Sequence, residues 1–297
     1  MIGPGVGPSS TGLARAAARR GGTTWVGPLP GNGDREVLIY RPEGWSGEGP
    51  VRLIVHFHGT YSEHVQRRRD GMSKKRWVGH KRLGQTLDAI DELQQTGQGD
   101  VALVYPLSAG KRAPNGHTGW WNQAFDSMWM VPDGTESFAG LLADARGVLV
   151  DTLGVERARL RARVTAQGHS AGGLALYNVA AAGASQVREY IFLDAAFEGW
   201  GEGCYQQIIA HKDRARMTIV VTDRGIADPF AGRTPWCAEA RAAGGADWDA
   251  VESWCHALAT DMQDNPRVAV HHTRVRHGDQ TRRFSGGLGL PADRFAR

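Results

Sequence analysis

Short apolar runs alternate along the chain with segments whose apolar residues recur at helical spacing. Runs that are rich in β-branched residues and end near Gly or Pro are typical of buried parallel strands. This pattern predicts strands at Glu36–Arg41, Arg52–His58, Val101–Tyr105, Ala162–Gln167, Tyr190–Leu193, Met217–Thr222 and Arg267–Val275. It predicts helices at about 80–95, from Phe138 to Leu149, at about 171–182 and at 246–260.

Strands that alternate with helices predict the α/β class, with a mostly parallel sheet and helices on both faces. Because these units follow one another without a linker-like break, we expect a single domain over residues 25–297. Residues 1–24 are rich in Gly, Ser, Ala and Arg, which predicts a flexible N-terminal tail. Residues 107–135 show little periodicity but contain several Trp residues, so we expect a Trp-rich insertion there.

Composition and charge narrow the class of protein. The chain has 297 residues, of which 41% are hydrophobic and 22% charged, so disorder is excluded as its main state. No run of about 18 apolar residues exists, and we expect no membrane span. The N-terminus lacks the apolar segment of a Sec signal peptide, which leaves a cytoplasmic location or export by another route. A net charge of +4 is too small for a dedicated nucleic-acid binder, and we expect no nucleic-acid partner.

The cysteine pattern leaves two interpretations open. No CxxC occurs, which excludes a zinc ribbon or a thioredoxin-type site. Cys204, Cys237 and Cys255 are buried free thiols in the first interpretation, because unpaired Cys is commonly buried. In the second, Cys237 and Cys255 form a disulfide in an exported protein.

The sharpest motif is Gly168-His169-Ser170-Ala171-Gly172, a GxSxG between a predicted strand and a predicted helix. So tight a turn forces the Ser into strained backbone angles, and the glycines beside it provide room. Ser170 Oγ would then stand exposed as a nucleophile. The N–H of Ala171, at a helix N-terminus, would point at a developing oxyanion. The alternative is a packing turn in which Ser170 is only a helix cap.

Here the chain resembles the α/β-hydrolase superfamily over about residues 36–280. The strand at Arg52–His58 runs into His56-Phe57-His58-Gly59-Thr60, which is similar to the HG loop of lipases and esterases. The resemblance implies an oxyanion hole formed by the N–H of Ala171 and a second N–H from Thr60 or Tyr61, with Gly59 in the loop. This chain has HGT where many members have HGGG.

The resemblance also implies a triad in the chain order Ser, Asp, His. Asp194 ends the strand after the nucleophile helix, as in the LDPA segment of pancreatic-type lipases, and we favour it as the acid. Asp228 and Asp223 are the alternatives, because most superfamily members keep the acid one strand later. His277 follows the last strand, where the superfamily keeps its histidine. His271 and His272 lie inside that strand and are poorer candidates.

Several other side chains have a functional and a purely structural interpretation. His56 and His58, with His64, could form a metal site, but HxH lacks further ligands, and we expect packed histidines and no metal. The basic run at 67–82 is a solvated face or a contact for an anionic surface. We expect the substrate to contact Trp120, Trp121, His169 and Tyr61. Trp120, Trp121 and Trp129 suit a substrate cleft or a buried core equally well, and Phe197 and Trp200 could join the rim of that cleft.

The function that these features predict is a serine hydrolase that cleaves an ester through an acyl-enzyme and needs no cofactor. The N-terminal segment VLIYRPEGW and the Trp-rich insertion resemble the corresponding parts of feruloyl esterases and polyhydroxybutyrate depolymerases. That resemblance implies a small-molecule or polymer-linked ester whose acyl group is carried on carbohydrate or polyester. The alternatives are a peptidase or amidase that acts on cell-wall material, and a non-catalytic binding protein with the same fold.

Overall fold

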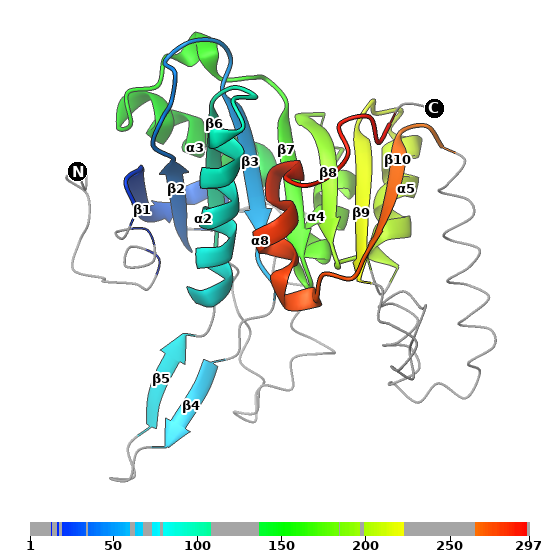
Figure 1. Cartoon of the computed structure of the whole chain (residues 1–297), viewed down its shortest axis with the longest axis horizontal. Helices are drawn as coiled ribbons and strands as arrows, with labels where there is room; N and C mark the ends of the chain where they lie inside the picture. Colours follow the sequence, from blue (N-terminus) through cyan, green and yellow to red (C-terminus); the bar gives the residue numbers. More distant parts are fainter. Residues whose placement is uncertain are drawn as a thin grey trace.

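The computed structural model describes residues 13, 17, 20–33, 35–59, 63–67, 73–77, 80–107, 137–183, 185–196, 199–222 and 265–295. In this part of the chain eight strands form the main sheet, in the order β1-β2-β6-β3-β7-β8-β9-β10 (Figure 1). They are β1 (Thr23–Leu29), β2 (Arg35–Arg41), β3 (Arg52–Phe57), β6 (Val101–Pro106), β7 (Val164–His169), β8 (Val187–Leu193), β9 (Arg216–Thr222) and β10 (Val268–Thr273). A separate antiparallel hairpin pairs β4 (Glu63–Arg67) with β5 (Ser73–Trp77).

The pairing directions in the main sheet agree with the predicted class. Six neighbouring strands are mutually parallel, in the order β6, β3, β7, β8, β9 and β10. The remaining strand pairs, β1 with β2 and β2 with β6, are antiparallel. If the hairpin strands are left out and the eight strands of the main sheet are renumbered 1 to 8 along the chain, their order in the sheet is 1-2-4-3-5-6-7-8. This is the order of the α/β-hydrolase fold, so the predicted fold class is confirmed.

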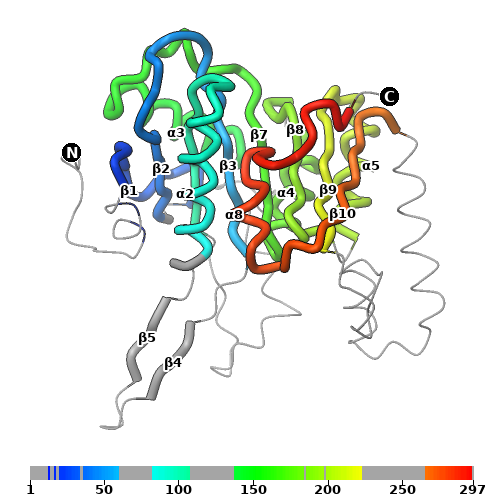
Figure 2. The backbone as a smooth tube through the Cα atoms, viewed as in Figure 1, coloured from blue at the N-terminus to red at the C-terminus, as the bar shows by residue number. Residues whose placement is uncertain are grey.

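Helices cover both faces of the sheet because its central strands are apolar on both sides. Leu53, Val55 and Phe57 of β3 face α3 (Phe138–Asp151), α4 (Gly172–Ala181) and α5 (Trp200–Ala210). Ile54, between them in sequence, faces α2 (His80–Gln95). The short helix α8 (Gln280–Phe284) lies beside α2 on that second face, as the backbone path in Figure 2 shows. Burial on both faces explains why the strands read as continuous apolar runs.

The predicted strands and the helices at 80–95, 138–149 and 171–182 are confirmed to within a few residues. The structure adds β1, the β4–β5 hairpin, α5 and α8, which the pattern did not predict. β1 contains Gly27 and Pro28, which are poor strand formers, and it is an edge strand in which a missing N–H is tolerated. The predicted helix at 246–260 and all but Leu107 of the predicted insertion lie outside the described residues.

Several residues of the expected N-terminal tail contact the domain, among them Thr23 and Thr24, which begin β1 and pair with β2. Leu13 and Ala17 are 0% and 1% exposed and belong to the same apolar cluster as α2. Arg20 pairs with Asp91 of α2 at 2.8 Å and also with Asp88. The apolar spacing of Leu13 and Ala17 is too short a pattern to predict this packing. No helix in the described ranges has the length and hydropathy of a membrane span.

Candidate active site

The carboxyl ends of the parallel strands bring the predicted site residues to one edge of the sheet, the lower edge in Figure 1. Phe57 of β3 pairs with Gly168 of β7, and His169 of β7 pairs with Leu193 of β8. Ser170 and Asp194 therefore leave the sheet from adjacent strands at the same level. In open parallel sheets this edge is where ligands commonly bind.

The turn at Ser170 has the strained geometry that the GxSxG motif predicts. Ser170 has φ of 53°, in the left-handed region that residues other than Gly rarely adopt. Its N–H donates to Leu193 O at 3.3 Å, and its carbonyl accepts from the N–H of Gly173 at 3.0 Å. A Cβ at Gly168 would lie 2.4 Å from Gly172 O, and one at Gly172 would lie 2.2 Å from Phe57 O. Only glycines allow β3, β7 and α4 to approach so closely.

The loop after β3 passes directly beside this serine. A Cβ at Gly59 would lie 2.9 Å from Ser170 Cβ, so the backbone of the HG loop passes beside Ser170. The N-terminus of α4, with Ala171 immediately before it, lies on the other side of the turn. A helix N-terminus carries a partial positive charge that favours an oxyanion. Thr60 and Tyr61 lie outside the described residues.

Asp194 and His277 are joined by a hydrogen bond. His277 Nδ1 lies 2.7 Å from Asp194 Oδ2. Asp194 is 1% exposed, whereas the side chain of His277 is 35% exposed, so the ring extends from a buried acid toward solvent. A carboxylate can only accept here, which assigns the proton of the neutral ring to Nδ1 and leaves a lone pair on Nε2.

The buried carboxylate is held by neighbouring backbone as well. The N–H of Asp194 donates to Val220 O at 2.9 Å, and Asp194 Oδ1 accepts from the N–H of Thr222 at 3.4 Å. Thr222 in turn donates through Oγ1 to Val275 O at 3.0 Å and accepts from Gln280 Nε2 at 2.7 Å. These bonds tie the end of β9 to the segment that carries His277. Gln280 is a member of the site that the sequence analysis did not identify.

The backbone of His277 is held from the opposite side by two further residues. His169 Nε2 lies 2.9 Å from the His277 carbonyl oxygen, and Arg82 Nη1 donates to the same oxygen at 3.4 Å. Since a carbonyl only accepts, the proton of His169 is on Nε2. The two imidazole rings lie 4.5 Å apart. His169 is 2% exposed, and burial, with the nearby charge of His277 and Arg82, lowers its pKa well below the usual value.

His169 was predicted to contact substrate, and that role stays a prediction. What the structure describes is a neutral ring that holds the His277 backbone. Arg82 was part of the basic run that the sequence analysis assigned to a solvated face or an anionic surface. Nothing in the spacing of that run distinguishes Arg82 from its neighbours.

His56 and His58 are packed histidines beneath the site. Gln167 Nε2 donates to His56 Nδ1 at 2.6 Å, while Gln167 Oε1 accepts from the N–H of Gly286 at 2.6 Å. His58 Nδ1 donates to Gly59 O at 2.5 Å. Both rings stack on Tyr105. Burial lowers the pKa of His56 to about 3, with a contribution from His58, and the pKa of His58 to about 4.

The remaining predicted residues divide into two sets. Within the described residues, His271 lies against Phe284, His272 is exposed, Trp200 is buried in the core and Cys204 is a buried free thiol. Outside them lie Trp120, Trp121, Trp129, Phe197, Asp223, Asp228, Cys237, Cys255 and the side chain of His64. No group of three or more His, Cys, Asp or Glu side chains in the described ranges is placed to hold a metal ion.

Comparison with known proteins adds distant structural likeness. No protein-family model matches the chain, and no curated protein matches it. An IroE-like serine hydrolase from Shewanella oneidensis is 11% identical, with a TM-score of 0.45 over 89% of this chain and 80% of that chain. Siderophore hydrolase EstA from Aspergillus nidulans is 11% identical, with a TM-score of 0.46 over 93% and 95%.

The poly(3-hydroxybutyrate) depolymerase LpqC from Bordetella parapertussis is 17% identical, with a TM-score of 0.45 over 97% of this chain and 99% of that chain. Likeness at this level assigns no substrate. The strand order and the parallel connections, with a strained serine turn after β7, give this chain the α/β-hydrolase fold.

Proposed function

We propose that this protein is a serine hydrolase that cleaves carboxylic esters through an acyl-enzyme. Ser170 is the nucleophile, His277 the general base and Asp194 the acid of the triad. The observation that carries the proposal is the 2.7 Å bond between His277 Nδ1 and Asp194 Oδ2, one strand away from the strained turn of Ser170. The chain order Ser, Asp, His is the order of α/β-hydrolases.

In the first step Ser170 Oγ attacks the ester carbonyl carbon while His277 Nε2 takes the hydroxyl proton. The Asp194 carboxylate accepts the Nδ1–H, keeps Nε2 free to act as the base, and stabilises the imidazolium that forms. When the tetrahedral intermediate collapses, the bond to the alcohol oxygen breaks. His277 then returns its proton to that oxygen, so the alcohol leaves neutral and Ser170 carries the acyl group.

The negative charge on the carbonyl oxygen needs donors that are already in place. The N–H of Ala171, at the start of α4, and the N–H of Thr60, after Gly59, are the donors in this proposal. The close approach of Gly59 to Ser170 supports it, because a Cβ at position 59 would lie 2.9 Å from Ser170 Cβ, so the backbone of the HG loop passes directly beside the serine. Water then attacks the acyl-enzyme, again with His277 as the base, and releases the acid.

The test is covalent labelling with a fluorophosphonate probe, followed by mapping of the labelled peptide. We expect the wild-type chain to be labelled at Ser170 and Ser170→Ala to be unlabelled. Ser185→Ala, at an exposed serine distant from the turn, is the matched control and should label as wild type. No labelling of the folded wild type would favour a non-catalytic binding protein and contradict the proposal.

A second measurement separates esters from amides. Aryl esters of increasing acyl length should be hydrolysed by the wild-type chain, and the corresponding anilides should react far more slowly. Efficient turnover of anilides or cell-wall peptides, with esters poorer, would identify an amidase. Trp120 and Trp121 are proposed to contact the substrate, and Trp121→Ala should raise KM for large acyl groups more than for acetyl esters.

A further inference from the structure

A cavity of about 480 Å³ lies at the edge of the sheet opposite the candidate active site. It is bounded by the amino ends of β3, β8 and β9, where Arg52, Arg188 and Arg216 are found. The segment from Gly286 to Phe295 closes its other side. Since the parallel strands run from this cavity to Ser170 and Asp194, the two sites lie at opposite ends of the same strands, the upper and lower edges of the sheet in Figure 1.

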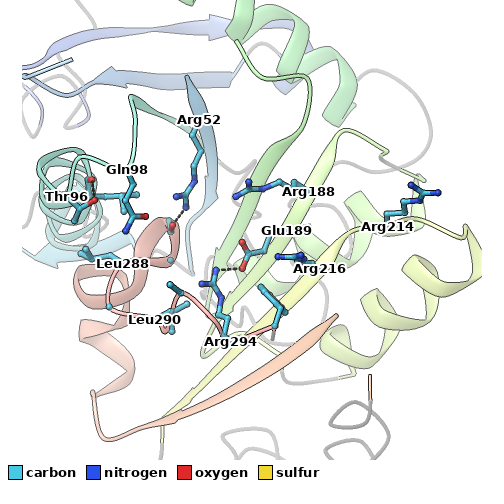
Figure 3. A pocket seen from close by; sticks show the side chains of 16 residues that line it. Arg52, Thr96, Gln98, Arg188, Glu189, Arg214, Arg216, Leu288, Leu290 and Arg294 are labelled. Atoms are coloured by element: carbon cyan, nitrogen blue, oxygen red, sulfur yellow. Dashed lines mark hydrogen bonds and ion pairs between the residues drawn. The ribbon is translucent and has the colours of Figure 1, made fainter. Parts of the chain in front are cut away.

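The cavity is lined by a large excess of positive charge. Five arginines contribute to its wall, and Glu189 is the single acidic residue among the lining residues that the structure describes. In Figure 3 the side chain of Arg188 extends toward Arg52, Glu189 and Arg294 lie paired beside them, and Arg214 lies farther out. Positive groups that converge on one concave space favour an anionic ligand.

Protein acceptors neutralise only part of this charge. Arg294 Nη2 pairs with Glu189 Oε1 at 2.6 Å, and Glu189 also accepts from Thr218 Oγ1 at 2.8 Å. Arg52 donates to the Gly286 carbonyl through Nη2, while its Nε is buried and has no hydrogen-bond partner in the described structure.

Arg188, the second residue of β8, and Arg216, the first residue of β9, have fewer contacts with protein acceptors. Arg216 stacks on Phe295 at 4.9 Å from the ring centroid, a contact that leaves its N–H groups available. Among the described residues no hydrogen bond or ion pair holds Arg188. Both side chains belong to exposed residues at the mouth of the cavity.

The arginines also repel one another. Burial lowers the pKa of Arg52 to about 10, and the charges of Arg188 and Arg294 act in the same direction, while Glu189 opposes them. An anion placed among these groups would relieve the repulsion and supply the acceptors that the protein lacks. Guanidinium groups bind phosphate and carboxylate oxygens in pairs of parallel bonds, which suits a ligand with several such oxygens.

The geometry points to a second binding site here, for a small molecule that carries two or more phosphate or carboxylate groups. The volume of the cavity falls in the range of small-molecule sites and exceeds what one inorganic anion needs. Leu288 and Leu290 provide apolar wall beside the arginines, so part of the ligand can be uncharged. The site is separate from Ser170 and does not depend on the proposed hydrolase activity.

Isothermal titration calorimetry on the full chain tests this site, with tripolyphosphate and citrate as probes of the two oxyanion types. We expect at least one probe to bind with one-to-one stoichiometry, and binding to weaken as ionic strength rises. Arg188→Gln and Arg216→Gln should each reduce the affinity about tenfold, because each removes a charge-assisted bond. Binding of tripolyphosphate alone would identify phosphate as the ligand group, and binding of citrate alone would identify carboxylate.

Arg283→Gln is the matched control, since it removes the same charge from an exposed arginine of α8 that does not line the cavity. It should leave the affinity unchanged, and the melting temperature of each variant without probe should match wild type. Absence of binding by both probes would overturn the inference. Equal weakening by Arg283→Gln would overturn it as well, because the binding would then reflect overall charge.

Discussion

Asp194 Oδ2 lies 2.7 Å from His277 Nδ1, although 83 residues separate the two along the chain. The bond depends on two independent supports. Asp194 is held at the end of β8 by Val220 and Thr222 of β9, and the backbone of His277 is held by His169 and Arg82. His169 immediately precedes Ser170, so the support of the His277 backbone comes in part from the serine turn itself.

Replacement of Asp194 by Asn should reduce kcat for an aryl ester by about 10⁴ with little change in KM. Asn has nearly the same size, but its amide offers an N–H where His277 needs an acceptor, and the ring then takes the wrong tautomer. Asp228→Asn and Asp223→Asn should change kcat far less. A loss of this size in Asp228→Asn, with Asp194→Asn near wild type, would move the acid to the next loop.

Ser170→Ala and Ser170→Gly should both lose turnover by about 10⁴ or more, because triad members act as a unit. They should differ in stability. Ala keeps the strain of a φ of 53°, whereas Gly adopts that angle freely. The free energy of unfolding of the glycine variant should therefore be about 1 kcal/mol larger than that of the alanine variant. Chemical denaturation measures the difference. A glycine variant that is the less stable of the two would contradict strain at this turn.

The sequence could predict the strands and the elbow because local pattern determines them. β3 and β7 are apolar runs buried on both faces, and Gly168 and Gly172 are required by backbone contacts within the turn itself. β1 was missed because its position at the sheet edge allows Gly27 and Pro28 in a strand. α5 contains Gly201 and Gly203, which weaken its helical pattern, and its burial against α4 compensates.

Long-range relationships were the part that pattern could not supply. The choice between Asp194 and Asp228 depends on which loop meets His277 in space, and the spacing of the two residues in the chain does not encode that. Arg82 supports the His277 backbone from a helix that precedes it by 195 residues. The arginine-lined cavity is likewise assembled from positions scattered over several strands, so no local run of sequence reveals it.

Gly172→Ala should destabilise the fold by about 1–3 kcal/mol, because the new Cβ would lie 2.2 Å from Phe57 O and would push β3 away from α4. Activity should fall with it, since the same shift moves Gly59 relative to Ser170. Gly147→Ala is the matched control: it lies in α3, and apart from the helix's own backbone the nearest atom to its Cβ would be Asp151 Oδ2, at 3.9 Å. That variant should gain about 0.5–1 kcal/mol from helix propensity. Equal effects at the two positions would contradict the tight packing of the elbow.

Stability should also fall as the solution becomes mildly acidic, because the folded state buries neutral histidines. The pKa of His56 is about 3 and that of His58 about 4, against 6.5 for an ordinary histidine, and the pKa of His169 is lowered as well. Below about pH 6.5 the unfolded chain therefore binds protons that the folded chain does not. The stability from each ring is fully present above that pH and decreases by about 1.4 kcal/mol per pH unit as the pH falls.

The contribution of one ring can be isolated between about pH 6.5 and pH 5, above the range in which ordinary carboxylates titrate. His58→Asn removes the titrating group but keeps a donor near the position of Nδ1, so Gly59 O retains a partner. Urea unfolding across this window should show the pH slope of the wild-type chain reduced by about 1.4 kcal/mol per pH unit in His58→Asn. His211→Asn, at an exposed histidine, is the control. An unchanged slope in His58→Asn would mean that His58 is already protonated in the folded protein, and its hydrogen bond beside the serine turn would then have to be reassigned.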